Sequence, residues 1–149
     1  MREIEGMSVL ITGGGSGIGA GTARYLAQRG ARVTITGRRK AKVDEVAAAI
    51  GPNCHSIAGD VANDADRRRM IDAAVAHGGG LQTLINNAAD MYRGPITDLE
   101  ADKILNLFNI NVVAGMMLTG LAVAHLEKRG GAIIFIDSSG NNLRSECFT

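Results

Sequence analysis

The chain has 149 residues, of which 46% are hydrophobic and 21% charged, and its formal net charge is +1. This length and balance fit one soluble domain with a sizeable core, and they create no field that would attract nucleic acid or an acidic membrane. The core must be aliphatic, because only 3% of the residues are aromatic and none is Trp. We therefore expect a single domain over residues 1–149.

Short apolar strands alternate with helical patterns along the chain. The first strand covers residues 8–12, and apolar residues at helical spacing follow a glycine-rich turn until Gly30 ends that helix. The same alternation continues to the end of the sequence. The further strands are expected at residues 32–36, 55–59, 83–86 and 132–136, and the further helices around residues 43–50, 70–75 and 99–129. This order predicts βαβ units, and hence a parallel sheet with helices on both faces.

The glycine-rich turn, residues 12–19, follows a strand and opens a helix. In such a turn Gly13 permits the sharp bend, Gly17 lets the backbone approach a diphosphate, and Gly19 lets helix and strand pack closely. Backbone N–H groups and the positive end of the helix dipole then face the anion. The residues expected to bind a dinucleotide here are Gly13, Gly15, Ser16, Gly17, Ile18 and Gly19. The alternative is a flexible glycine loop without a ligand.

The order of the motifs resembles the short-chain dehydrogenases/reductases. The turn Thr12-Gly13-x-x-x-Gly17-Ile18-Gly19 is followed by motifs in the family's order: Asp60-Val61, Asn86-Asn87-Ala88-Ala89, Asn111 and Ser138. The resemblance runs from about Ser8 to Gly140. It implies an α/β, Rossmann-type, doubly wound parallel sheet in three α/β/α layers, with five strands in the order 3-2-1-4-5. It also implies hydride transfer between a nicotinamide cofactor and a small-molecule carbonyl or alcohol substrate.

The end of the second strand bears on the choice of cofactor. An acidic residue there binds the ribose 2′-hydroxyl of NAD, whereas an arginine accommodates the 2′-phosphate of NADP. The sequence reads Gly37-Arg38-Arg39, with no carboxylate before Asp44. A guanidinium offers bidentate hydrogen bonds to phosphate, so we expect Arg38 and Arg39 to favour NADP(H) over NAD(H). Alternatively, Arg38, Arg39, Lys40 and Lys42 form only a solvated basic surface.

The resemblance assigns five more residues to the cofactor. It places Asp60 near the adenine amino group, Val61 on the adenine ring, and Asn87 with the backbone of Ala88 and Ala89 along the ribose. The family usually has glycine at the last of these positions, and we expect the methyl group of Ala89 to be tolerated. Alternatively, Asp60 is a helix cap or turn residue, and the other motif is an ordinary turn at the end of a strand.

The resemblance gives catalytic roles to Ser138 and Asn111. In the family the serine steadies the substrate oxygen, and the asparagine holds a water in a proton relay. Ser139 and Asn109 are competing candidates, and each role could instead be a local cap or a polar core contact. A Tyr-x-x-x-Lys motif follows the serine in the family, but the eleven residues after Ser138 contain neither Tyr nor Lys. We therefore expect this polypeptide to bind NADP(H) weakly and to turn over little or nothing.

Three hypotheses follow. The first is an NADP(H)-preferring short-chain dehydrogenase/reductase whose present form stops before the Tyr and Lys. The second is a non-catalytic NADP(H)-binding module or subunit, and the third is a structural assembly unit without nucleotide affinity. The resemblance also implies a homo-oligomer, because the long helix helps to form a subunit interface in this family. Its apolar residues include Met116, Met117, Leu118, Leu121 and Val123.

Other sequence features carry little functional weight. The N-terminus lacks an apolar signal region, and no apolar run approaches the roughly 20 residues that span a bilayer. We expect a cytoplasmic chain with reduced, inert thiols at Cys54 and Cys147 and no membrane or nucleic-acid partner. The three histidines lack Cys or carboxylate neighbours at metal-ligand spacing, so we expect no metal. The basic run Arg67-Arg68-Arg69 should form the solvated face of a helix.

Overall fold

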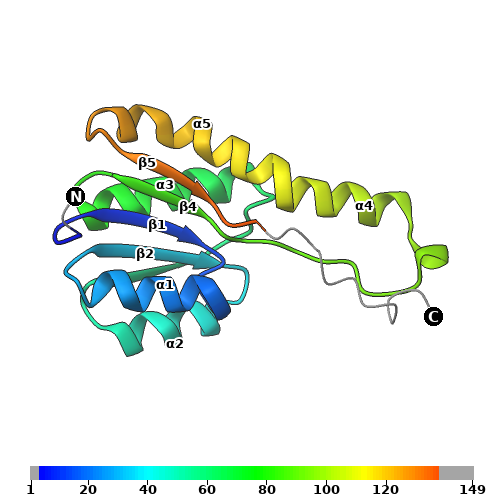
Figure 1. Ribbon diagram of the computed structural model, residues 1–149, viewed down its shortest axis with the longest axis horizontal. Coiled ribbons are helices and arrows are strands. Elements are labelled where there is room, and N and C mark those ends of the chain that lie inside the picture. Colours follow the sequence, from blue (N-terminus) through cyan, green and yellow to red (C-terminus); the bar gives the residue numbers. More distant parts are fainter. Residues whose placement is uncertain (1–3, 138–149) are drawn as a thin grey trace.

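The computed structural model describes residues 4–137 and contains one five-stranded sheet (Figure 1). All pairings are parallel, and the strand order is β3-β2-β1-β4-β5. The strands are β1 (Ser8–Thr12), β2 (Arg32–Gly37), β3 (Cys54–Ala58), β4 (Thr83–Asn86) and β5 (Ala132–Phe135). The predicted strand order is confirmed, although β3 begins one residue earlier than the sequence suggested.

Helices cover both faces of the sheet, which confirms the predicted three-layer, doubly wound architecture. Helices α1 (Gly17–Ala27) and α2 (Lys40–Ile50) lie on one face (Figure 1). Helices α3 (Asp64–Gly78) and α5 (Ala114–Glu127) lie on the other, and α4 (Ala101–Phe108) continues the line of α5 beyond the sheet. A short 3-10 turn, η1 (Ile96–Asp98), precedes α4.

The core consists of two aliphatic clusters separated by the sheet. Successive side chains of a strand point to opposite faces, so Val9 and Ile11 pack under α1 and α2, whereas Leu10 packs under α3 and α5. All five residues of β1 are buried. This explains why β1 reads as a continuous apolar run rather than an alternating one, as expected for a central parallel strand.

The long helix differs from the prediction in two respects. It is not continuous, because a π-helical segment, η2 (Asn109–Val113), separates α4 from α5. Together Ala101–Glu127 form one rod of 27 residues, in which an 18-residue window reaches a mean hydropathy of 1.8, so the rod is long and apolar enough to cross a membrane by length and composition alone. The expectation that no such stretch exists was therefore wrong. One face of α5 packs on the sheet through Leu118 and Ala122, and a core helix of a soluble protein passes the same test.

The basic run on α3 is not wholly solvated, contrary to our expectation. Arg67 is only 6% exposed, and its Nη1 donates a hydrogen bond of 2.7 Å to the carbonyl oxygen of Val61. Its neighbours Arg68 and Arg69 are exposed and pair with Asp64 and Asp66. Arg67 lies on the core side of the helix, where it fixes the backbone of the loop between β3 and α3.

Candidate cofactor site

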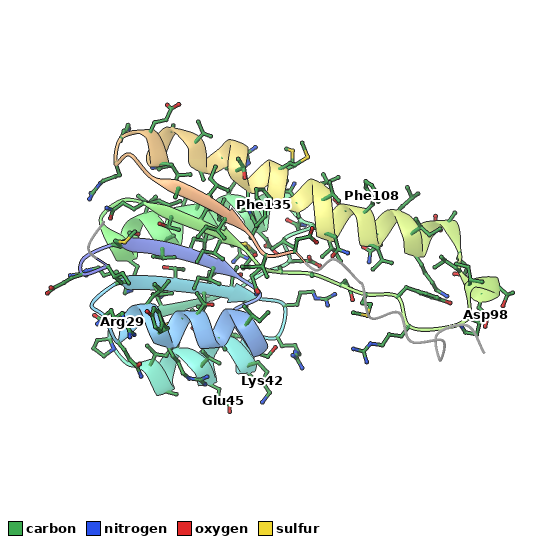
Figure 2. All side chains as sticks on the ribbon, viewed as in Figure 1. Arg29, Lys42, Glu45, Asp98, Phe108 and Phe135 are labelled. Atoms are coloured by element: carbon green, nitrogen blue, oxygen red, sulfur yellow. The ribbon has the colours of Figure 1, made fainter. Side chains whose placement is uncertain are left out.

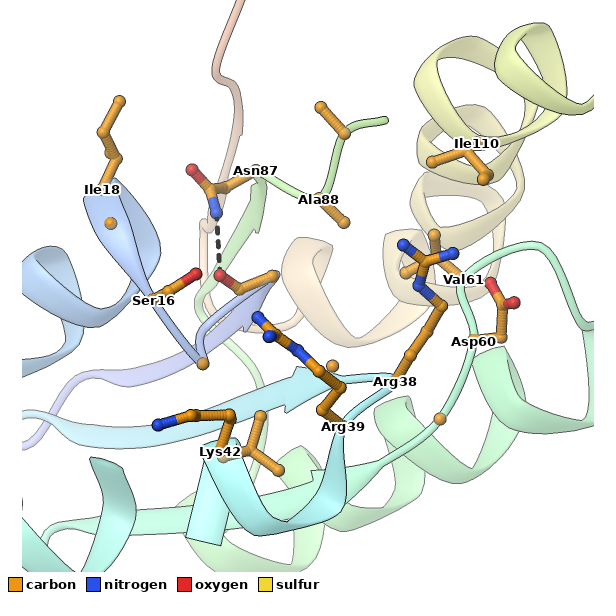
Figure 3. A pocket seen from close by; sticks show the side chains of 17 residues that line it. Ser16, Ile18, Arg38, Arg39, Lys42, Asp60, Val61, Asn87, Ala88 and Ile110 are labelled. Atoms are coloured by element: carbon orange, nitrogen blue, oxygen red, sulfur yellow. Dashed lines mark hydrogen bonds between the residues drawn. The ribbon is translucent and has the colours of Figure 1, made fainter. Parts of the chain in front are cut away.

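A cavity of about 470 Å³ opens at the carboxyl ends of β1, β2 and β3 (Figure 3). The strand order reverses between β1 and β4, and open α/β sheets bind their ligands at such a switch point. Of the thirteen residues predicted to bind a cofactor, twelve line this cavity and Gly19 does not. The twelve predicted residues that line the cavity are Gly13, Gly15, Ser16, Gly17, Ile18, Arg38, Arg39, Asp60, Val61, Asn87, Ala88 and Ala89.

In the glycine turn, close packing requires glycine at Gly19, whereas Gly17 borders open space. A Cβ on Gly19 would lie 2.4 Å from the carbonyl oxygen of Gly13, so only glycine lets α1 approach the turn this closely. Gly17 has a φ of +53°, which favours glycine, and a Cβ there would meet no atom within 4 Å. The space beside Gly17 therefore belongs to the cavity. The turn presents bare backbone and the N-terminus of α1 to a ligand, and this suits a diphosphate.

Thr12 and Asn87 join the turn to the end of β4. The Thr12 hydroxyl oxygen accepts hydrogen bonds from the backbone N–H groups of Asn87 and Ala88, at 3.0 and 2.9 Å. In return, the Asn87 side-chain amide donates to the carbonyl oxygens of Thr12 and Gly13, at 2.9 and 3.2 Å. Asn87 thus holds the shape of the turn, a role that the sequence analysis did not assign to it. Its contact with a cofactor ribose stays a prediction.

The cationic side of the cavity comes from the start of α2. Figure 3 shows Arg39 reaching in on the Ser16 side and Arg38 on the Val61 side. Arg38 Nη2 lies 3.7 Å from Asp90 Oδ2, and Lys42 pairs with Glu45 at 2.9 Å. Arg39 has no ion pair among residues 4–137. Two guanidinium groups at the cavity rim form a site suited to a phosphate.

Beside Arg38, the cavity wall is the turn at Asp60 and Val61, which α3 holds in place. Asn63 caps α3 by accepting a hydrogen bond from the backbone N–H of Asp66 at 3.0 Å. The Asp66 carboxylate accepts a hydrogen bond of 2.8 Å from the backbone N–H of Asp60, and this bond, together with Arg69, lowers the Asp66 pKa. Asp60 Oδ1 in turn accepts from Ala62 N–H at 2.9 Å. Asp60 is therefore a turn residue as well as a cavity residue.

A second cavity of about 400 Å³ adjoins the first, past Ala88 and Ala89. Asn111, in the π-helical segment, lines it and is clamped to the backbone of Asp90: its Oδ1 accepts from Asp90 N–H at 2.8 Å, and its Nδ2 donates to the Asp90 carbonyl at 2.9 Å. The role of Asn111 in a proton relay stays a prediction. Ser138, the other predicted catalytic residue, lies outside the described residues.

Several cavity residues were not among the predicted cofactor residues. They are Gly37, Lys42, Val43, Gly59 and Ile110. Gly37 and Lys42 stand beside the Arg38-Arg39 pair, so their proximity could have been read from the sequence. Ile110 reaches the cavity only because the helix after β4 packs next to the Asp60-Val61 turn, and no local pattern indicates that.

Comparison with known proteins settles the family. The family model described as short chain dehydrogenase matches residues 7–149. The chain belongs to the short-chain dehydrogenase family. The human protein named dehydrogenase/reductase SDR family member 4 is a relative that is 36% identical over 134 residues, covering 87% of this chain and 48% of the human protein. The chain spans about half the length of the curated relatives it matches, with 55%, 51% and 48% of three of them covered.

Solved structures of family members have the same architecture. A short-chain dehydrogenase from Burkholderia cenocepacia in complex with NADP superposes with a TM-score of 0.87 at 32% identity, covering 98% of this chain and 62% of that one. The 3-ketoacyl-(acyl-carrier-protein) reductase from Brucella melitensis, complexed with NADH, gives a TM-score of 0.87 at 30% identity, covering 93% and 60%. Similar folds in this family thus occur with either nicotinamide nucleotide.

Proposed function

We propose that this chain is the dinucleotide-binding part of an NADP(H)-dependent short-chain dehydrogenase/reductase. The observation that carries this proposal is the cavity at the switch point, which has a glycine turn on one side and two arginines on the other. The bare backbone of Gly13–Gly19 would hold the diphosphate, and Arg38 and Arg39 would hold the 2′-phosphate. The adenine would lie against Val61, beside Asp60.

The bound cofactor would supply or accept a hydride, with a carbonyl or alcohol as the second reactant. This chain's own residues would hold and orient the nucleotide, and the second cavity, adjoining the first, is where a small-molecule substrate would lie. Asn111 would hold a water there, and Ser138 would hydrogen-bond the substrate oxygen. No tyrosine or lysine follows Ser138 in the printed sequence. We therefore expect binding without appreciable turnover from these 149 residues, and the second candidate function is a non-catalytic NADP(H)-binding module.

We further propose that a second copy of the chain covers the outer side of the long helix. Exposed apolar side chains gather there, and patches of this kind mark interfaces. The side chains are Ile104, Leu105, Phe108, Val112, Val113, Met116, Met117 and Val123. Leu118, which we had grouped with them, is instead buried against the sheet.

The cofactor proposal is tested by calorimetric titration of the purified chain with NADPH and NADH. Arg38→Ala should weaken NADPH binding by roughly tenfold or more, because a hydrogen-bonded charge pair contributes about 1.5–3 kcal/mol, and should change NADH binding little. Arg29→Ala removes a guanidinium that stacks on Tyr25, away from the cavity, and serves as the matched control. Equal losses for both nucleotides would refute the NADP(H) preference, and no binding of either would refute the function.

A further inference from the structure

Asp90 places a carboxylate beside the arginine that we assign to the 2′-phosphate. It follows the Asn86–Ala89 motif directly, and it lines the second cavity while its Oδ2 faces Arg38, which lines the first. The two side chains approach to 3.7 Å, with 61% of the Arg38 side chain and 35% of the Asp90 side chain exposed. The pair therefore bridges the boundary between the two cavities.

The chain holds Asp90 in place without help from Arg38. Its backbone N–H and carbonyl are both bonded to the Asn111 side chain, at 2.8 and 2.9 Å. Its Oδ1 accepts a hydrogen bond from Met91 N–H at 2.9 Å, so only Oδ2 is turned to the arginine. Arg38 is the more exposed and longer partner. A ligand would therefore displace the arginine more easily than the anchored carboxylate.

We propose that Asp90 is a specificity-determining residue, which competes with the ribose 2′-phosphate for Arg38 and so moderates the preference for NADP(H) over NAD(H). This inference rests on the proposed function, because it requires Arg38 to meet the cofactor ribose. The competition has two parts. Arg38 must leave or share its pairing with Asp90 to bind the phosphate, and the fixed carboxylate remains a negative charge near a second anion.

The 2′-hydroxyl of NADH carries no charge, so neither part of the competition applies to it. Asp90 therefore weakens the binding of NADPH and leaves the binding of NADH nearly unchanged. The partial exposure of both side chains limits the effect, since exposed ion pairs contribute only about 0.2–1 kcal/mol. The expected shift is correspondingly about two- to fivefold in NADPH affinity.

The test compares Asp90→Asn with the unchanged chain by calorimetric titration with each nucleotide. Asparagine keeps an oxygen that can accept from Met91 N–H and loses only the charge, so the loop geometry should survive. NADPH should bind about two- to fivefold more tightly, with NADH unchanged. Asp98→Asn makes the same charge change at the far tip of the molecule, where Figure 2 labels Asp98, and it should alter neither affinity.

A double-substitution cycle shows whether the effect passes through Arg38. In the Arg38→Ala background, Asp90→Asn should give a smaller gain in NADPH affinity than it gives alone. An undiminished gain there, an equal gain for both nucleotides, or no gain in a chain that binds NADPH normally would overturn the inference. If the unchanged chain binds neither nucleotide, the proposed function itself fails, and if Arg38→Ala weakens both equally, its NADP(H) preference fails, so these failures are distinguishable from that of the inference.

Discussion

Individual residues of the glycine turn are constrained by backbone contacts. Gly19 sits against the carbonyl oxygen of Gly13, and a Cβ would also come within 2.6 Å of Asn87 Nδ2. Gly21 lies two residues further along, on the exposed side of the same helix, and a Cβ there would meet no atom within 4 Å. These two glycines of the helix therefore differ in whether the surrounding atoms exclude a side chain. Gly19 is required by packing, and Gly21 is required by nothing that the described residues show.

We expect Gly19→Ala to distort the turn, because the clash is with backbone that cannot rotate away. The substitution should lower the free energy of unfolding by about 1–3 kcal/mol and should abolish NADPH binding. Gly21→Ala should instead raise the free energy of unfolding by about 0.5–1 kcal/mol and leave binding intact. Urea unfolding and calorimetry on both variants provide the check. A Gly19→Ala chain that binds NADPH normally would show that the turn does not need this close approach.

At the scale of elements, the start of α3 organises the side of the cavity that Asp60 and Val61 form. The backbone N–H of Asn63, the Asp66 carboxylate and the buried Arg67 each bond the segment that carries Asp60 and Val61. None of them touches the cavity. They act indirectly, by holding the loop between β3 and α3 in place. Residues that support the ligand-contacting residues of a binding site commonly act in this way.

Asp66→Ala should lower the free energy of unfolding at pH 7 by about 1–2 kcal/mol, since it removes an ionised acceptor of a backbone N–H. The folded state lowers the Asp66 pKa below its ordinary value of 3.8, through the Asp60 N–H and Arg69. The stabilisation is therefore present above pH 3.8 and is lost as the pH falls toward the lowered value. The difference between the variant and the parent should shrink in urea unfolding at about pH 3.

Asp72→Ala, an exposed change on the same helix, is the matched control and should shift stability by less than about 0.5 kcal/mol at either pH. If the Asp66→Ala difference stays constant down to about pH 3, ionisation of Asp66 is not its source.

The sequence predicts elements better than contacts between them. The strands and their order follow from the alternation of apolar runs and helical patterns, together with the family motifs, and the glycine turn follows from its place between a strand and a helix. The burial of Arg67 could not be predicted, because a run of three arginines does not indicate which of them is buried. Arg67 is buried because it donates a hydrogen bond to the Val61 carbonyl oxygen. The pairing of Arg38 with Asp90 joins loops 52 positions apart. No local pattern indicates the π-helical segment at Asn109–Val113.

At the scale of the whole molecule, exposed apolar side chains concentrate on the long helix, Ala101–Glu127, and on the edge strand β5. The long helix exposes its outer apolar side, and β5, at the edge of the described sheet, exposes Ile134 and Phe135. Large exposed apolar areas are uncommon on monomers. The second copy that we propose on the long helix would remove much of this surface from water.

We expect the chain to sediment as a dimer or higher oligomer, and we expect the double substitution Phe108→Asp with Met116→Asp to yield a monomer. Both side chains are more than half exposed, at 61% and 65%, so the change should not disturb the core. Tyr25→Asp alters a half-exposed aromatic side chain on α1, on the other face of the sheet from the rod, and should leave the assembly intact. A parent chain that is monomeric at all concentrations would contradict the proposal.

The bonds between Thr12 and Asn87 join residues 75 positions apart. A ribosome releases the glycine loop long before it makes the asparagine that fixes the loop's shape. The nucleotide pocket therefore closes late in biogenesis, after β4 has docked beside β1. A dinucleotide that binds only the finished pocket would stabilise the folded chain through mass action.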